Sequence, residues 1–224
     1  MKQIVVTLAA LVVVSGLFFS CSEKSQWKPL FGVNLSEADY DPAVWSETDG
    51  VLTAAKDEAI WTMVEYENFE LDLEFKTDVN SNSGVIVYCS DKQNWIPNAV
   101  EIQIADDYGS HFIGDDVHPY SKCGAIYGHL GASEPNVVNN PGEWNRMNII
   151  CKGQNIAVVL NGKMITEIDL SQWTSGTVNP DGSEIPPWLP TPFAELATKG
   201  YIGFQGKHGE AGIWFRNIKV RSLE

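Results

Sequence analysis

Apolar and polar positions alternate with a period of two along much of the chain. The clearest case is "NFELDLEFKT" at 68–77, where four apolar side chains alternate with four charged ones. Successive side chains of an extended strand point to opposite faces, so this pattern predicts a strand with one buried face. Further strands are expected at 84–89, 101–106, 146–151, 155–160, 163–168, 201–205 and 212–222.

Turn signals separate these segments, and "NG" at 161–162 predicts a tight hairpin. Helical periodicity is absent, apart from one possible turn at 192–196. Many short strands with this spacing predict an all-β fold, a sandwich of two antiparallel sheets. Residues 171–200 hold five of the 11 prolines and predict a long ordered loop, which in a compact domain is often functional.

The N-terminus is typical of a bacterial lipoprotein. Lys2 precedes an apolar stretch at 4–19, and Cys21 follows it. We therefore predict a signal peptide at 1–20, a lipidated Cys21 with a tether to residue 26, and a single domain at 27–224. An ordinary cleaved signal or an anchor helix is the alternative. In each case we expect the domain to be exported. A lipoprotein would lie in the periplasm or on the outer-membrane surface, attached to the membrane only by its lipid anchor.

Composition narrows the range of partners. The chain has 224 residues and a formal charge of −14, so a nucleic acid is an unsuitable partner, because phosphate binding requires a basic surface. The 8 Trp, 7 Tyr and 9 Phe can form a core or stack on sugar rings. After Cys21, three cysteines remain without metal-ligand spacing. We expect Cys89, Cys123 and Cys151 to be core residues, with a disulfide between two of them as the alternative.

Candidate catalytic residues occur in "VEIQIAD" at 100–106. If Ile102 and its apolar neighbours face the core, Glu101 and Gln103 share the opposite face. Asp106 joins them only through a bend or bulge. His208, in a glycine-flanked loop, is the best candidate base among the four histidines, since the pKa of histidine suits proton transfer near neutral pH. The alternative is a solvated polar face and a surface histidine.

A wider set of side chains could contact a ligand. Glu101, Gln103 and His208 could hold a divalent metal, and Asp115, Asp116 and His118 form a second conceivable ligand set. Aromatic residues in strands are usually core, and a lysine in a loop is usually solvated, so each assignment competes with a structural role. The predicted substrate contacts are Gln103, Trp61, Tyr88, Tyr127, Gln205, Lys207 and Asn82.

The motifs also occur in a characteristic order that covers nearly the whole mature chain. They resemble the 3-keto-disaccharide hydrolase domain family. The matching pieces are "LF" (30–31), "W…DGVL" (45–52), "WT…YENFELDLEF" (61–75), "NSGV" (82–85), "EIQIAD" (101–106), "GAIYG" (124–128), "PGEWN" (141–145), "LNG" (160–162) and "GYIGFQGKHG…FRNIKV" (200–220).

The resemblance implies a jelly roll of the concanavalin A-like lectin and glucanase type, acting on glycosides whose sugar carries a ketone at carbon 3. Such a ketone acidifies the proton on carbon 2, so a base can start elimination of the aglycone, and later addition of water gives net hydrolysis. The reaction needs a base, a stabiliser for the carbon-3 oxygen and an acid; a divalent metal could act as the stabiliser. Glu101, His208 and Asp106 are the candidate catalytic residues.

Two other functions remain open at this point. The chain could be a non-catalytic carbohydrate-binding module, which needs aromatic and amide side chains but no base. It could also be a conventional glycoside hydrolase that uses paired carboxylates on unoxidised sugars. In all three cases the expected partner is a small carbohydrate or glycoside, and the oligomeric state is open.

Overall fold

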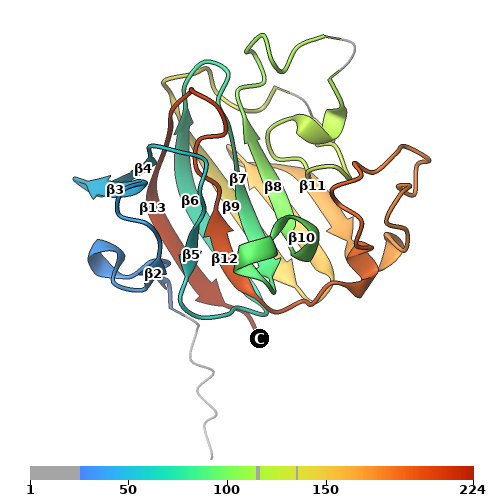
Figure 1. Ribbon diagram of the computed structural model, residues 1–224, viewed down its shortest axis with the longest axis horizontal. Helices are drawn as coiled ribbons and strands as arrows, with labels where there is room; N and C mark the ends of the chain where they lie inside the picture. The colour runs from blue at the N-terminus through green and yellow to red at the C-terminus, as the bar shows by residue number, and fades with distance from the viewer. Residues whose placement is uncertain (1–25, 115–116, 135) are drawn as a thin grey trace, which may run out of the picture.

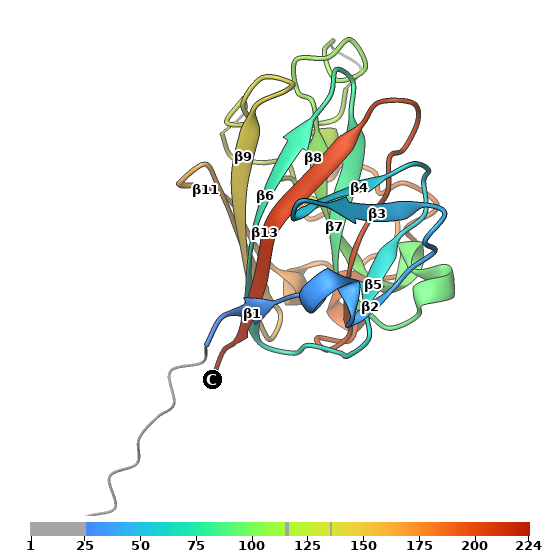
Figure 2. The ribbon, with the colours of Figure 1, turned by 90° about the vertical axis from the view of Figure 1, so that its left-hand side faces the viewer.

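Two antiparallel β-sheets stack face to face in the computed structural model (Figures 1 and 2). The structure describes residues 26–114, 117–134 and 136–224. These residues confirm the predicted all-β sandwich. Their only helices are short 3-10 turns: η1 (Val33–Leu35), η2 (Lys92–Asn94), η3 (Ile96–Asn98), η4 (Pro119–Ser121), η5 (Leu170–Gln172) and η6 (Phe193–Glu195).

The larger sheet has eight strands within the described residues. Their order is β11-β10-β9-β6-β13-β4-β3, and β1 pairs with β13 beside this path. Figure 2 shows β1 lying across β13 near the C-terminus. The strands are β1 (Lys28–Pro29), β3 (Trp45–Thr48), β4 (Val51–Ala54), β6 (Phe69–Thr77), β9 (Trp144–Lys152), β10 (Asn155–Leu160), β11 (Lys163–Asp169) and β13 (Ile213–Ser222).

The smaller sheet has five strands in the described part of the chain, in the order β2-β5-β12-β7-β8. Strands β7, β8 and β12 correspond to segments that the alternation predicts, whereas the short β2 and β5 were not predicted. The strands are β2 (Ala38–Asp39), β5 (Ile60–Thr62), β7 (Asn82–Cys89), β8 (Val100–Ala105) and β12 (Tyr201–Phe204).

The hydrophobic core fills the space between the two sheets. Leu71 and Leu73 of β6 and Ile102 and Ile104 of β8 are fully buried in one cluster. Each such side chain stabilises the fold by about 2 kcal/mol. Because Ile102 and Ile104 face this core, the intervening side chains of β8 point outward from the smaller sheet, as the sequence predicts.

Several predictions concern cysteines and the membrane. Cys89, Cys123 and Cys151 are buried and free, which confirms them as core residues. The predicted signal peptide, Cys21 and most of the tether lie outside the described residues, so lipidation stays a prediction. Among the described residues, no helix is long and apolar enough to cross a membrane.

Candidate active site

A cavity of about 470 Å³ opens on the outer face of the five-stranded sheet. Its volume lies in the range of small-molecule sites. It brings together six of the predicted site residues with four that were not predicted. The lining residues are Asp57, Asn82, Trp95, Ile96, Glu101, Gln103, Tyr127, Trp188, Gln205 and His208.

The floor of the cavity is formed by β7 and β8. Gly84 of β7 pairs with Gln103 of β8, and the side chain of Glu101 lies across Gly84. A Cβ at position 84 would stand only 2.2 Å from Oε1 of Glu101, so only glycine leaves room for the carboxyl group. The Gln103 amide donates a hydrogen bond of 2.8 Å to Oδ1 of Asn82, which fixes both amides beside Glu101.

The loop after β12 follows β7 and carries His208 to the cavity. The backbone amides of Gln205 and His208 donate to the carbonyl oxygens of Gly84 and Asn82, each at 2.9 Å. A Cβ at Gly206 would lie 2.1 Å from the carbonyl oxygen of Lys56. The glycine in "QGKHG" therefore lets this loop approach the β4–β5 loop backbone to backbone.

This close approach pairs His208 with Asp57. Nδ1 of His208 lies 2.5 Å from Oδ2 of Asp57, with both side chains partly exposed. A carboxylate at one ring nitrogen fixes the orientation of the imidazole. The other nitrogen, Nε2, is then available to exchange a proton with a ligand in the cavity.

Aromatic side chains form two walls. "GAIYG" at 124–128 runs beside β8, where the Tyr127 amide donates to the Glu101 carbonyl at 2.9 Å. Trp188, 54% exposed, comes from the proline-rich loop at 171–200 and forms a hydrogen bond with Tyr127. Trp95 and Ile96, between β7 and β8, form the other wall. The cavity thus combines polar groups on its floor with apolar surfaces at its sides.

The electrostatic surroundings change the proton affinity of Glu101. Burial and the negative charge of Asp57 raise the pKa of Glu101 to about 8 from its ordinary value of 4.5. Burial and the neighbouring Glu101 also raise the pKa of Tyr127. Glu101 is therefore mainly protonated at neutral pH, in a state from which it can donate a proton. Such perturbed carboxyl groups in clefts are characteristic of active sites.

The raised pKa of Glu101 predicts that folding stability falls as the pH rises from about 4.5 to 8. Over this range the folded state keeps the proton and the unfolded state has released it, so each step up in pH favours unfolding. The expected loss is on the order of 5 kcal/mol, and it levels off above pH 8.

Urea unfolding of the wild type and of Glu101→Gln at several pH values measures this loss. Other carboxyl groups contribute equally to both proteins, so the difference between the two curves isolates Glu101. That difference should grow toward pH 8 in favour of the variant. A constant difference from pH 4.5 to 8 would contradict the raised pKa.

Tyr88 and Asp106 lie outside the cavity, for reasons that depend on backbone geometry. Simple alternation from Gly84 and Ile86 would put Tyr88 on the cavity face. A bulge in β7 with a φ of 58° at Tyr88 turns it into the core instead, where its hydroxyl donates to the carbonyl of Gly153. Buried Asp106 accepts the backbone amide of Asn80 at 2.9 Å and so stabilises a loop.

Trp61 and Lys207 lie next to the cavity without lining it. Trp61 packs across Gly203, and its ring meets that of Trp95 edge-on at 6.4 Å. It therefore supports a wall of the cavity. Lys207 extends toward Glu210, with its Nζ 3.3 Å from the backbone carbonyl of that residue. Neither residue is placed to touch a ligand on the cavity floor.

The residues that sequence reasoning missed are Asp57, Trp95, Ile96 and Trp188. Asp57 is 151 positions from His208, so no local spacing could reveal the pair. Trp188 had an indirect signal, because its proline-rich loop was expected to be functional.

The predicted metal ligands Glu101, Gln103 and His208 line the same cavity. Within the described residues no group of three or more His, Cys, Asp and Glu side chains is arranged to hold a metal ion. Asp115 and Asp116 of the second conceivable set lie outside those residues. The predicted set of Glu101, Gln103 and His208 includes an amide and so is not such a group, and metal binding by these residues stays a prediction.

A family model described as the 3-keto-alpha-glucoside-1,2-lyase-like domain matches residues 26–221. The chain belongs to this family. The match confirms the resemblance inferred from the ordered motifs. It also spans every element that forms the cavity, from the β4–β5 loop to the loop after β12.

Individual relatives agree with this assignment. A 3-keto-disaccharide hydrolase of Bacteroides thetaiotaomicron is 31% identical over 180 residues, covering 71% of this chain and 60% of that protein. This chain therefore spans less than two thirds of that curated relative. The crystal structure of a candidate glycosyl hydrolase from Parabacteroides distasonis is 69% identical, with a TM-score of 0.86 over 88% of this chain and 100% of that chain.

More distant structures share the fold alone. A Bacillus subtilis protein of unknown function with a galectin-like fold is 13% identical and has a TM-score of 0.53, over 88% of this chain and 94% of that chain. The similarity of this chain to a galectin-like fold, together with its two antiparallel sheets, confirms the predicted concanavalin-like jelly roll.

Proposed function

We propose that this protein cleaves 3-keto-glycosides by removing the proton on carbon 2 and eliminating the aglycone from carbon 1. The observation that carries the proposal is the pairing of two proton-transfer groups in one cavity. These are Glu101, with its pKa raised to about 8, and His208 bonded to Asp57. The family and the name of the Bacteroides relative support a sugar with a ketone at carbon 3.

In the first step, Nε2 of His208 takes the proton from carbon 2. The electron pair of the broken C–H bond forms a double bond between carbons 2 and 3, and the ketone oxygen becomes an enolate. The carboxylate of Asp57 stabilises the imidazolium that results. The amide groups of Gln103 and Gln205 are the neutral donors on the cavity floor that can hydrogen-bond the enolate oxygen.

In the second step, the enolate restores the ketone and a double bond forms between carbons 1 and 2. The bond from carbon 1 to the glycosidic oxygen breaks, and that oxygen takes the proton of Glu101. The aglycone leaves as an alcohol, and the sugar remains as an unsaturated ketone. Addition of water across the new double bond gives the 3-keto sugar and completes net hydrolysis. His208 then returns its proton to Glu101 or to solvent.

The deciding experiment compares 3-keto-glucosides with their unoxidised partners, each with and without a chelator. Aglycone release from the keto member alone is the expected result, and sensitivity to the chelator would assign a metal to the reaction. Release from both members would identify a conventional glycosidase. Sugar binding without release would identify a binding module. Either of these last two results overturns the proposal.

Gly84→Ala tests the space that the floor provides for Glu101. The new Cβ would meet Oε1 of Glu101 at 2.2 Å, so the carboxyl group must move. We expect turnover to fall about 100-fold, the effect of a misplacement of about 1 Å in an active site. Circular dichroism should show that the fold survives.

The double variant with Glu101→Gln serves as the control for this effect. If Gly84 acts through Glu101, the double variant should be no slower than Glu101→Gln alone. Independent, additive losses would show that Gly84→Ala damages the site in another way.

A further inference from the structure

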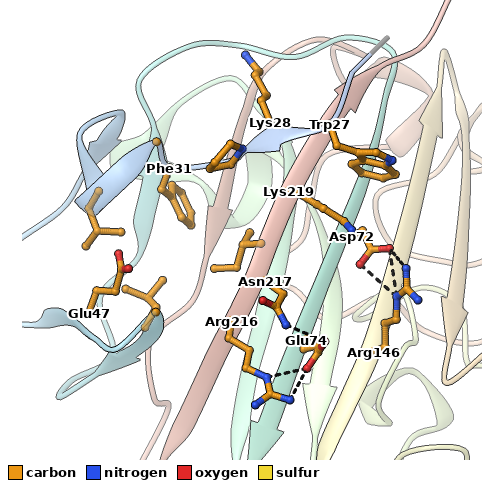
Figure 3. Close-up of a pocket in the computed structure, with 16 residues that line it drawn as sticks. Trp27, Lys28, Phe31, Glu47, Asp72, Glu74, Arg146, Arg216, Asn217 and Lys219 are labelled. Atoms are coloured by element: carbon orange, nitrogen blue, oxygen red, sulfur yellow. Dashed lines mark hydrogen bonds and ion pairs between the residues drawn. The ribbon is translucent and has the colours of Figure 1, made fainter. Parts of the chain in front are cut away.

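A second, larger cavity lies on the opposite face of the sandwich, on the outer side of the eight-stranded sheet (Figure 3). Its volume is about 620 Å³. One wall is the segment from Trp27 to Leu35, and another is the β3–β4 hairpin with Glu47 and Leu52. The floor belongs to β6, β9 and β13. None of its residues lines the candidate active site, so any ligand here is a separate one.

The floor is a fixed array of planar polar side chains. Arg146 donates to both carboxylate oxygens of Asp72, with a shortest distance of 2.6 Å, although Asp72 is only 5% exposed. Glu74 accepts hydrogen bonds from Arg216 at 2.7 Å and from Asn217 at 2.9 Å (Figure 3). These contacts restrain the side chains before any ligand arrives, which lowers the entropy cost of binding.

A β-bulge in β13 makes this array possible. Neighbouring strand residues normally point to opposite faces, yet Arg216 and Asn217 both bond Glu74. The pairing of β13 with β6 shifts between Arg216 and Lys219, and Asn217 adopts a φ of 53°. Bulges of this kind often redirect side chains beside binding sites.

The side chains of this array have further hydrogen-bond donors and acceptors that a ligand could use. Each guanidinium has five N–H donors, of which its carboxylate partner uses only some, and Asn217 retains its amide oxygen. The exposed carboxylate of Glu47 adds a further acceptor. Phe31, Leu35, Leu52 and Ile218 add apolar surface beside these groups.

The charges in this cavity are nearly balanced. Lys28, Arg146, Arg216 and Lys219 face three carboxylates, those of Glu47, Asp72 and Glu74. The carboxylates would repel an anion, and the basic groups would repel a cation. A neutral molecule with many hydroxyl groups matches the mixed donors and acceptors and the apolar wall. We propose that this cavity is a second, non-catalytic binding site for a neutral saccharide, on the face of the sandwich opposite the candidate active site.

The test is an NMR titration of the ¹⁵N-labelled protein with maltose, cellobiose, trehalose and maltohexaose, and with glucuronate as the anionic comparison. We expect a neutral sugar to shift the amide signals of Asn217, Ile218 and Gly50. Asn217→Gly keeps the backbone conformation, because glycine accepts a positive φ, but removes the amide side chain. It should weaken this binding about tenfold, the effect of losing one hydrogen-bonding pair.

Two control variants test whether the sugar binds in this cavity and not elsewhere on the protein. Glu167→Gln, on β11 of the same sheet but outside the cavity, should bind the sugars as the wild type does. Trp188→Ala, in the opposite cavity, should also leave the shifts at Asn217 unchanged, whatever the outcome for the proposed reaction. No shift at these amides with any neutral sugar, stronger shifts with glucuronate, or equal affinity in Asn217→Gly would each overturn the proposal.

Discussion

Glu101→Gln is expected to reduce aglycone release from a 3-keto-glucoside about 1,000-fold. The amide has the size of the carboxyl group but cannot transfer a proton, so the leaving oxygen must depart as an alkoxide or take its proton from water. General acid catalysis typically contributes about 100- to 10,000-fold. The measurement is the steady-state rate with matched substrates whose aglycones are good and poor leaving groups.

The leaving group makes this prediction specific to proton donation. A phenol that leaves readily needs little help, so its release should suffer less in Glu101→Gln than release of an alkyl alcohol. The wild-type rate should also decline above about pH 8, where Glu101 loses its proton, and the variant should lack this decline. Glu167→Gln, far from the cavity, is the control. Equal losses for both leaving groups would assign Glu101 another role.

Part of this site follows from alternation along one strand, β8. The pattern of "VEIQIAD" predicts that Glu101 and Gln103 share a face, and the structure places both on the cavity floor because Ile102 and Ile104 face the core. The motifs "GAIYG" and "QGKHG" contain Tyr127 and His208, and both residues line the cavity. The sequence predicts these residues as candidates because strand geometry or a glycine-rich loop determines where their side chains point.

The remaining features depend on contacts between distant segments. Asp57 contacts His208 only because Gly206 leaves room for the backbone of Lys56, the residue before Asp57. The spacing of these residues in the sequence does not predict that contact. Tyr88 was a candidate as an aromatic residue that could stack on a sugar, but the bulge in β7 turns it inward. In both cases one residue with unusual backbone freedom or conformation decides the outcome.

Two glycines of the motifs thereby gain a physical explanation. Gly84 leaves room for Glu101, and Gly206 lets the β4–β5 loop bring Asp57 to His208. Asp57 in turn is one cause of the raised pKa of Glu101. The proton donor and the base are therefore coupled through one carboxylate, so a change at Asp57 must affect both groups.

His208→Ala is expected to lower turnover about 100- to 1,000-fold, because no other group is paired and oriented as a base in the cavity. Imidazole added to the solution should restore part of the rate, since it can occupy the space left by the side chain and accept the proton on carbon 2. Lys207→Ala, at the adjacent position but outside the cavity, is the matched control and should remain close to wild type.

Asp57→Asn separates orientation from proton transfer. The variant keeps His208, so turnover should fall less than in His208→Ala, and imidazole should not restore it. Removing the negative charge should also lower the pKa of Glu101, because Asp57 contributes to raising it. The decline of the rate at high pH should then begin below pH 8. An unchanged pH profile in Asp57→Asn, or no rescue of His208→Ala by imidazole, would contradict the coupled pair and place the base elsewhere in the cavity.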